Sequence, residues 1–180
     1  FYTEEEAQKY EAENGWVLKE DAGRGWRRVV ASPQPIRIVE EDTIRLLLAQ
    51  NVIVIAVGGG GIPVIENEKG ELEGRAAVID KDLASCLLAK NLKADVFIVS
   101  TGVDKVAIDY KKPTQRELDQ LTVAEAKKYM AEGQFPAGSM GPKIAAAIDF
   151  LENGGKRVII TQPHLLPEAI AGKNGTHLIP

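Results

Sequence analysis

The 180-residue sequence is poor in the residues that build covalent or metal-bound frameworks, because it contains one cysteine and two histidines. The single cysteine, Cys86, excludes a disulfide within the chain and fits a reducing cytosol. His164 and His177 lack companions at metal-ligand spacing, so the sequence predicts no metal site. No apolar run reaches ~18 residues, the length that a transmembrane helix needs. The net charge of −4 argues against a general nucleic-acid-binding role.

What the sequence does contain is an alternation of β-branched runs and helical patterns. Buried strands are expected at 51–57 (NVIVIAV), 95–100 (DVFIVS) and 156–161 (KRVIIT). Helices are expected at 3–14, 40–50, 79–91, 123–132, 142–153 and 166–172, a hairpin tip at 67–72, a short strand at 106–110 and an edge strand at 176–180. This order predicts an α/β fold with a mainly parallel sheet between two layers of helices. Ligands bind such sheets at the carboxyl ends of the strands.

The segment FPAGSMGPKI places a lysine, Lys143, in the first turn of an expected helix. Pro142 suits the first helical position, and Ile144, Ile148 and Leu151 recur at helical spacing. A basic side chain is disfavoured at the positive end of the helix dipole, whereas an anion is favoured there. The lysine therefore either binds an anionic ligand together with the helix terminus or is an ordinary surface residue.

Four consecutive glycines, Gly58, Gly59, Gly60 and Gly61, follow the expected strand at 51–57. Their spacing does not fit the dinucleotide-binding fingerprint, because the third glycine of that pattern would fall at Pro63. Glycines let a ligand approach the backbone, and successive N–H groups can bind an anion. The run predicts a ligand contact, with a tight bend between two strands as the alternative.

Three further segments place charge near the expected ends of the strands. In VIDKDLAS, Lys81 and Asp82 begin a helix, where they serve either as a cation with its orienting carboxylate or as a helix cap beside an exposed lysine. STGVDKVAIDY is a polar loop after a buried strand, which could border a nucleotide or be a common turn. GRGWRRVV concentrates arginines that either bind an anion or form a surface charge cluster.

Together, AVGGGGIPV, VIDKDLAS, STGVDKV and FPAGSMGPKI resemble the carbamate kinases, a branch of the amino-acid kinase superfamily. DAGRGWRRVVASPQP also resembles that branch rather than the acetylglutamate, aspartate or uridylate kinases. The resemblance implies reversible phosphoryl transfer between ATP and carbamate, giving ADP and carbamoyl phosphate. It also implies Mg²⁺ held chiefly by the phosphates, a cytoplasmic enzyme and a place in arginine metabolism, with neither nucleic acid nor membrane as a partner.

The resemblance assigns roles to residues of this chain. Lys143 would bind the ATP phosphates and the transferring phosphoryl group, Lys81 would stabilise that group from another side, and Asp82 would hold the lysines in place. The glycines from Gly58 to Gly61 would hold the carbamate or carbamoyl group. The expected nucleotide-binding residues come from two loops and are Ser100, Thr101, Gly102, Val103, Asp104, Val106, Tyr110, Gly138, Ser139, Met140 and Gly141.

The sequence also departs from the family, whose members begin with a strand that leads into a Gly-Gly-Asn loop. The chain is therefore expected to be a C-terminal portion, with residues 1–35 as a remnant of a protruding lobe and residues 36–180 as the nucleotide-binding core. The full-length protein is expected to be a homodimer. An unpaired sheet edge is expected to make the isolated chain poorly stable or oligomeric. Two alternatives stay open, a nucleotide-binding module without turnover and another kinase of the superfamily that acts on an acylated amino acid.

Overall fold

The computed structural model describes residues 1–21 and 23–180, and these residues form two compact units. The first unit consists of Phe1–Gln34 and Gly59–Ile79, and the second consists of Pro35–Gly58 and Asp80–Pro180. A bridge between Ala31 and Ala77 joins the two segments of the first unit, and the Val78 N–H donates to the Ala31 carbonyl at 2.9 Å. The division expected from the sequence, at residue 35, differs from these units because it assigns residues 59–79 to the nucleotide-binding core. That division stays a prediction.

The first unit is built from a helix and two hairpins, with the bounds α1 (Glu4–Asn14), β1 (Val17–Glu20), β2 (Trp26–Val29), β3 (Val64–Glu66) and β4 (Leu72–Gly74). Thr3 caps α1, because its hydroxyl accepts the Glu6 N–H at 3.2 Å while the Glu6 carboxylate accepts the Thr3 N–H at 2.8 Å. The hairpin tip at 67–72 is confirmed, since the Asn67 side chain accepts from the N–H groups of Lys69 and Glu71.

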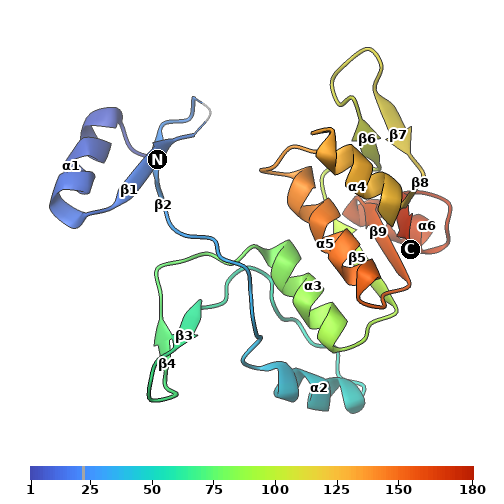
Figure 1. Cartoon of the computed structure of the whole chain (residues 1–180), viewed down its shortest axis with the longest axis horizontal. Coiled ribbons are helices and arrows are strands. Elements are labelled where there is room, and N and C mark those ends of the chain that lie inside the picture. The colour runs from blue at the N-terminus through green and yellow to red at the C-terminus, as the bar shows by residue number, and fades with distance from the viewer. Residues whose placement is uncertain (22) are drawn as a thin grey trace. The chain divides into compact units, whose positions relative to one another are not determined.

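The second unit is an α/β domain (Figure 1). Its elements are α2 (Glu41–Ala49), α3 (Lys81–Asn91), β5 (Val96–Ser100), β6 (Val106–Ile108), β7 (Arg116–Leu118), β8 (Gln120–Thr122), α4 (Val123–Ala131), α5 (Met140–Glu152), β9 (Arg157–Thr161), the 3₁₀ turn η1 (Pro163–Leu165), α6 (Leu166–Ile170) and β10 (Thr176–Ile179). Every helix expected from the sequence is present, with ends that differ by a few residues. In particular, α5 begins at Met140, two residues before Pro142, which still places Lys143 in the first helical turn.

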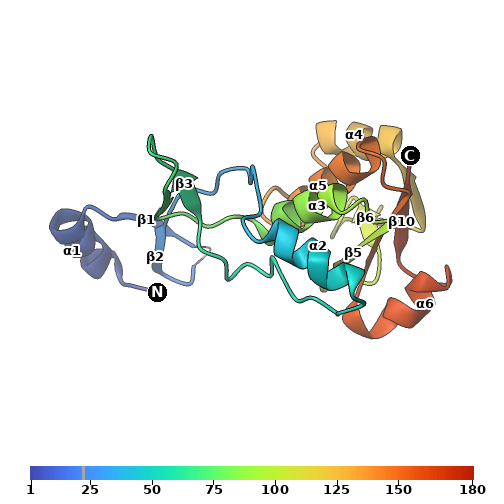
Figure 2. The same ribbon diagram turned by 90° about the horizontal axis from the view of Figure 1, so that it is seen from below.

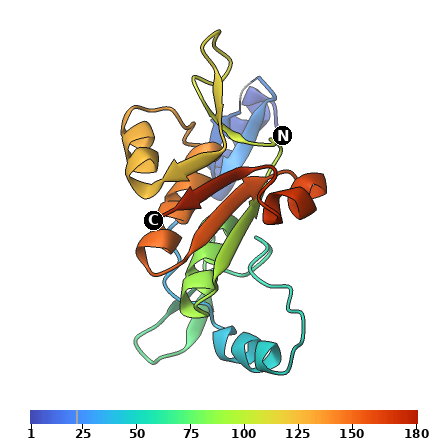
Figure 3. The same ribbon diagram turned by 90° about the vertical axis from the view of Figure 1, so that its right-hand side faces the viewer.

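Four strands form one sheet in the order β5-β9-β10-β8, with β9 between β5 and β10 (Figure 3). The pairs β5–β9 and β10–β8 are parallel, whereas β9 and β10 are antiparallel. The α/β class is confirmed, and the sheet is mixed. The sequence-based expectation that 176–180 is an edge strand is wrong, because β10 lies inside the sheet. The short turn and helix after β9 return the chain directly beside it, which makes the pair antiparallel.

The core lies between this sheet and the helices α3, α4 and α5, of which α3 and α5 pack side by side (Figure 1). Ile144, Ile148 and Leu151 form the buried face of α5, as the helical spacing predicts. Strand β9 is fully covered from Val158 to Thr161. On the other side of the sheet α6 contacts β9 (Figure 2). A side chain at Gly155 would collide with the Phe150 ring, since a Cβ there would lie 2.2 Å from a ring carbon.

Two of the expected buried strands differ from expectation. Residues 51–57 form no strand, and the side chains of Ile53 and Ile55 are 92% and 98% exposed. Strand β5 forms, but it is buried on one face only, because Val96 and Ile98 point outward. Strand β5 ends the sheet, and within the described part of the chain no strand pairs with its outer edge. The β-branched run at 51–57 therefore lacks the neighbours that would turn it into a strand.

The described residues include no helix that is both long and apolar enough to cross a membrane.

Candidate active site

The lysine of the FPAGSMGPKI segment is paired with a carboxylate from a neighbouring helix. Lys143 lies in the first turn of α5 and Asp82 in the first turn of α3, and the packing of these helices brings them together. The Lys143 Nζ lies 2.8 Å from the Asp82 Oδ2, and the two side chains are only 12% and 11% exposed. Asp80 caps α3 by accepting the Asp82 and Leu83 N–H groups, so the Asp82 carboxylate is left to bind the lysine.

Lys81 contacts the same carboxylate oxygen less closely. Its Nζ lies 3.4 Å from the Asp82 Oδ2, and its side chain is 54% exposed. Asp82 therefore holds Lys143 in a fixed position while Lys81 remains at the surface. The sequence placed these three residues in one site, and the structure brings them together; their roles in a reaction stay proposals.

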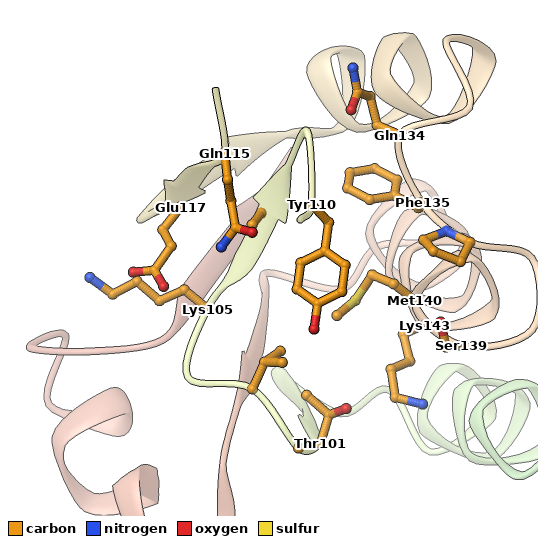
Figure 4. Close-up of a pocket in the computed structure, with 14 residues that line it drawn as sticks. Thr101, Lys105, Tyr110, Gln115, Glu117, Gln134, Phe135, Ser139, Met140 and Lys143 are labelled. Carbon is orange, nitrogen blue, oxygen red and sulfur yellow. The ribbon is translucent and has the colours of Figure 1, made fainter. Parts of the chain in front are cut away.

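A cavity of about 320 Å³ lies beside Lys143, within the second unit (Figure 4). Its volume is at the lower end of the range for small-molecule sites. At one end it is lined by Thr101 and Gly102, which directly follow β5, and by Ser139 and Lys143 around the start of α5. The cavity thus lies beyond the carboxyl end of a sheet strand, where α/β folds bind ligands.

Part of the cavity lining is an apolar wall, which consists of Val103, Ala107, Tyr110, Phe135, Pro136 and Met140. The Phe135 ring is fixed from behind by an edge-on contact with Tyr129, with 6.5 Å between ring centroids. Figure 4 shows the Tyr110 ring between Lys143 and the polar residues at the other end of the cavity. This wall can take a flat apolar group such as a nucleotide base.

The polar residues at the other end come chiefly from the β6–β7 hairpin. They are Lys105, Gln115 and Glu117, whereas Gln134, on the loop between α4 and α5, lies apart from them beside Phe135 (Figure 4). None of these four was predicted individually as a site residue, and neither were Ala107, Phe135 and Pro136. Lys105 and Ala107 do lie in the STGVDKVAIDY loop that was expected to border a nucleotide. The alternation of side chains along the short strand after Val103 could have indicated Lys105 and Ala107 as lining residues. These two residues are two positions apart, so their side chains lie on the same face of the strand.

Six of the eleven predicted nucleotide-binding residues line the cavity, namely Thr101, Gly102, Val103, Tyr110, Ser139 and Met140. Ser100, Asp104, Val106, Gly138 and Gly141 lie outside its lining. Val106 is completely buried in the core, on the opposite face of β6 from Lys105 and Ala107. The Asp104 carboxylate accepts a hydrogen bond from the Gln162 amide.

The loop before α5 is folded around the Pro136 carbonyl. The N–H groups of Ser139 and Gly141 donate to this oxygen at 3.1 and 2.9 Å. A Cβ at Gly141 would lie 3.1 Å from the same oxygen, so a side chain there would force the Pro136 carbonyl to shift by a few tenths of an ångström. The family resemblance also predicts that the amides of Gly138 to Gly141 donate to the ATP phosphates, and this stays a prediction. In this structure the N–H groups of Ser139 and Gly141 donate to the protein backbone.

The glycine run begins where the two units meet in the sequence, with Gly58 in the second unit and Gly59 to Gly61 in the first. Gly59 has a φ of 97°, a value that favours glycine, whereas a Cβ at Gly58, Gly60 or Gly61 would meet nothing within 4 Å. Val57, just before the run, has a φ of 49°, which is strained for a β-branched residue. The predicted ligand contact of these glycines stays a prediction.

The arginines of GRGWRRVV are occupied by neighbours in the first unit. Arg24 and Arg27 bind the Asp21 carboxylate at 2.8 and 2.9 Å, and hydrogen bonding from Arg24 lowers the pKa of that carboxyl. The Arg28 guanidinium lies 4.5 Å from the centre of the Trp16 ring. These contacts favour the interpretation as a surface charge cluster.

Cys86 lies in the core, as the sequence predicts. Its side chain contacts the Ala146 carbonyl at 3.1 Å, and burial raises the pKa of the thiol to about 12. At neutral pH the sulfur is therefore a poor nucleophile.

Several known proteins that are similar in sequence and in structure to this chain are carbamate kinases. A model of the amino acid kinase family matches residues 6–162. A carbamate kinase of Pyrococcus horikoshii is 53% identical over all 180 residues of this chain, and a carbamate kinase-like protein of Escherichia coli is 54% identical over 164 residues. A crystal structure of a carbamate kinase from Giardia lamblia bound to AMP-PNP superposes on 99% of the chain with a TM-score of 0.90 and 48% identity.

The chain spans little more than half of these proteins. It covers 57% of the Pyrococcus horikoshii sequence, 52% of the Escherichia coli sequence and 57% of the Giardia lamblia chain.

Proposed function

We propose, from the premise that the chain belongs to the amino acid kinase family, that it is the nucleotide-binding part of a carbamate kinase. Such an enzyme transfers a phosphoryl group reversibly between ATP and carbamate. The observation that carries the proposal is the Lys143–Asp82 pair at one end of a cavity with an apolar wall. The sequence similarity to carbamate kinases over the whole chain supports it.

The reaction requires positive charge and correctly positioned substrates more than it requires a general acid or base. Carbamate is already an oxyanion, so its attack on the terminal phosphate needs no general base. The obstacle is the approach of two anions, which cationic and N–H donors relieve. Lys143 has three N–H donors and gives one to Asp82, so two remain for phosphate oxygens. Asp82 fixes the direction in which the other two point.

We assign the remaining substrate groups to the rest of the site. The wall of Tyr110, Phe135 and Met140 would bind the nucleoside, and Lys81, being exposed, could reach the transferred phosphoryl group. Gly58 to Gly61 would hold the carbamate or carbamoyl group through backbone N–H donors. Mg²⁺ would arrive as part of the nucleotide substrate, and among the described residues no group of three His, Cys, Asp or Glu could hold a metal. A cytoplasmic homodimer with a role in arginine metabolism completes the proposal for the full-length protein.

The test is ATP formation from ADP and carbamoyl phosphate, with the unmodified chain and its Lys143→Ala variant in parallel. This direction avoids the instability of free carbamate. Lys156→Ala is the matched control, because Lys156 is an exposed lysine that is paired with Asp95. We expect Lys143→Ala to lower the rate by roughly a hundredfold or more, as the loss of a transition-state donor does, and Lys156→Ala to leave it unchanged. Equal rates for Lys143→Ala and the unmodified chain would refute the role of Lys143.

A nucleotide-binding module without turnover is the second candidate, and the placement of the whole cavity within one unit favours it. Calorimetric titration with ADP separates the two. A chain that binds ADP through Lys143 but forms no ATP is the module. Recovery of turnover when the N-terminal part of a related carbamate kinase is added would show instead that the chain is one portion of the enzyme.

A further inference from the structure

The β6–β7 hairpin presents one polar face to the cavity and one apolar face to the core. Ala107 pairs with Glu117 across the hairpin, and Val106 pairs with Leu118. Because side chains alternate along a strand, Lys105 and Ala107 lie on one face of the hairpin together with Gln115 and Glu117. All four line the cavity, whereas Val106 and Leu118 are buried in the core.

The cation on this face is held in place by a carboxylate outside the cavity. The Lys105 Nζ lies 2.5 Å from the Asp119 Oδ1, and this hydrogen bond raises the pKa of Lys105. The Glu117 charge raises the pKa of Lys105 further, and both side chains line the cavity. Figure 4 shows the ends of both side chains near each other, across Tyr110 from Lys143. Asp119 is largely exposed, so it anchors the lysine from the solvent side.

We propose that Lys105 and Glu117 form a donor–acceptor pair that reads the edge of the nucleotide base, with Glu117 accepting from the exocyclic amino group of adenine. The inference rests on the proposed function, because it takes the phosphates to lie at Lys143. A nucleotide whose phosphates bind Lys143 and whose base lies on the apolar wall extends its base edge toward the hairpin.

The chemistry of the two side chains fits a base edge better than a phosphate. An ionised carboxylate only accepts hydrogen bonds, and an ammonium group only donates them. Glu117 would repel a phosphate, whereas adenine presents an amino donor beside a ring-nitrogen acceptor. Ribose hydroxyls lie between base and phosphates, and they would therefore meet the middle of the cavity before they meet the hairpin.

The test compares ADP with purine riboside 5′-diphosphate, which is ADP without its amino group, by calorimetric titration of the 180-residue chain. We expect the unmodified chain to bind ADP roughly tenfold more tightly than the analogue, the contribution of a hydrogen bond to a charged group. In Glu117→Ala the preference should disappear, because ADP loses affinity and the analogue does not. In Lys105→Met both ligands should lose affinity equally, since both keep the ring nitrogens.

Two controls separate this inference from the proposed function. Glu132→Ala, at the end of α4 and outside the cavity, should leave both affinities unchanged. Tripolyphosphate, which has no base, should bind equally to the unmodified chain and to Glu117→Ala but not to Lys143→Ala. Loss of ADP and analogue affinity by the same factor in Glu117→Ala would overturn the base-reading role. Equal affinity of tripolyphosphate for the unmodified chain and for Lys143→Ala would instead overturn the phosphate site on which the inference rests.

Discussion

Two segments of this chain are similarly rich in β-branched residues but differ in structure, because one forms a buried strand and the other forms no strand. Residues 157–161 form β9, which lies between β5 and β10 with Val158 to Thr161 completely buried. Residues 51–57 are as rich in valine and isoleucine, but they form no strand and leave Ile53 and Ile55 almost fully exposed. The difference is the presence of hydrogen-bonding neighbours. A β-branched run fits a pleated, covered surface, and it becomes a strand only where other strands supply one.

The strongest test of this comparison is a pair of matched truncations, Ile160→Ala in β9 and Ile55→Ala in the exposed run. Ile160 is fully buried, so its truncation should lower the free energy of unfolding by about 2–5 kcal/mol. Ile55→Ala removes a side chain that contacts solvent and should change that free energy by less than about 0.5 kcal/mol. Urea denaturation at low protein concentration measures both. A comparable loss in the two variants would show that residues 51–57 are packed in solution.

Two Lys–Asp pairs of the chain also differ in burial. Asp82 binds Lys143 at 2.8 Å in a largely buried position, while Asp95 binds Lys156 at 2.6 Å with both side chains exposed. Asp82→Asn leaves a poorly solvated ammonium group and should cost about 2 kcal/mol of stability. Asp95→Asn should cost about 0–1 kcal/mol. Thermal unfolding of both variants checks this, and equal losses would contradict the difference in burial.

The double variant Ile53→Lys, Ile55→Lys is expected to change the free energy of unfolding least. Its expected effect is on the self-association of the chain. The unmodified chain is expected to associate through its uncovered apolar run and the outer edge of β5. Light scattering should show the double variant shifted toward monomer, with the free energy of unfolding changed by less than about 0.5 kcal/mol. Ile170→Lys, at an exposed position on α6, is the control and should leave assembly unchanged. A monodisperse unmodified chain that melts cooperatively would refute the expectation.

Local signals in the sequence predicted the helices well. The capping box of Thr3 and Glu6 and the helical spacing of Ile144 and Ile148 each depend on residues within two turns, and each is confirmed. Strand neighbours depend on residues far apart, and there prediction was weaker. The antiparallel return of β10 beside β9 and the missing partner of 51–57 could not be seen in local patterns.

The candidate site shows the same division. The family resemblance placed Lys143 and Asp82 in one site, and the structure brings them together because both lie at the starts of two packed helices. Glu117 was missed, and Lys105 was not singled out within the loop expected to border the nucleotide, since their common face depends on a pairing register that a loop motif does not reveal. Val106 was assigned to the nucleotide site although it lies in the core. Neighbouring residues of a strand point to opposite faces, and the motif alone did not show which residues face the cavity.

The pairing of Lys143 with Asp82 also bears on how quickly the site can empty. A lone, poorly solvated ammonium group would bind phosphate tightly and release it slowly. Here Asp82, which Lys81 also contacts, offsets part of the positive charge before a nucleotide arrives and again after the nucleotide departs. We therefore expect modest affinity and fast exchange of ADP and ATP. Such exchange would suit the reversible phosphoryl transfer proposed above, because the product of one direction is the substrate of the other.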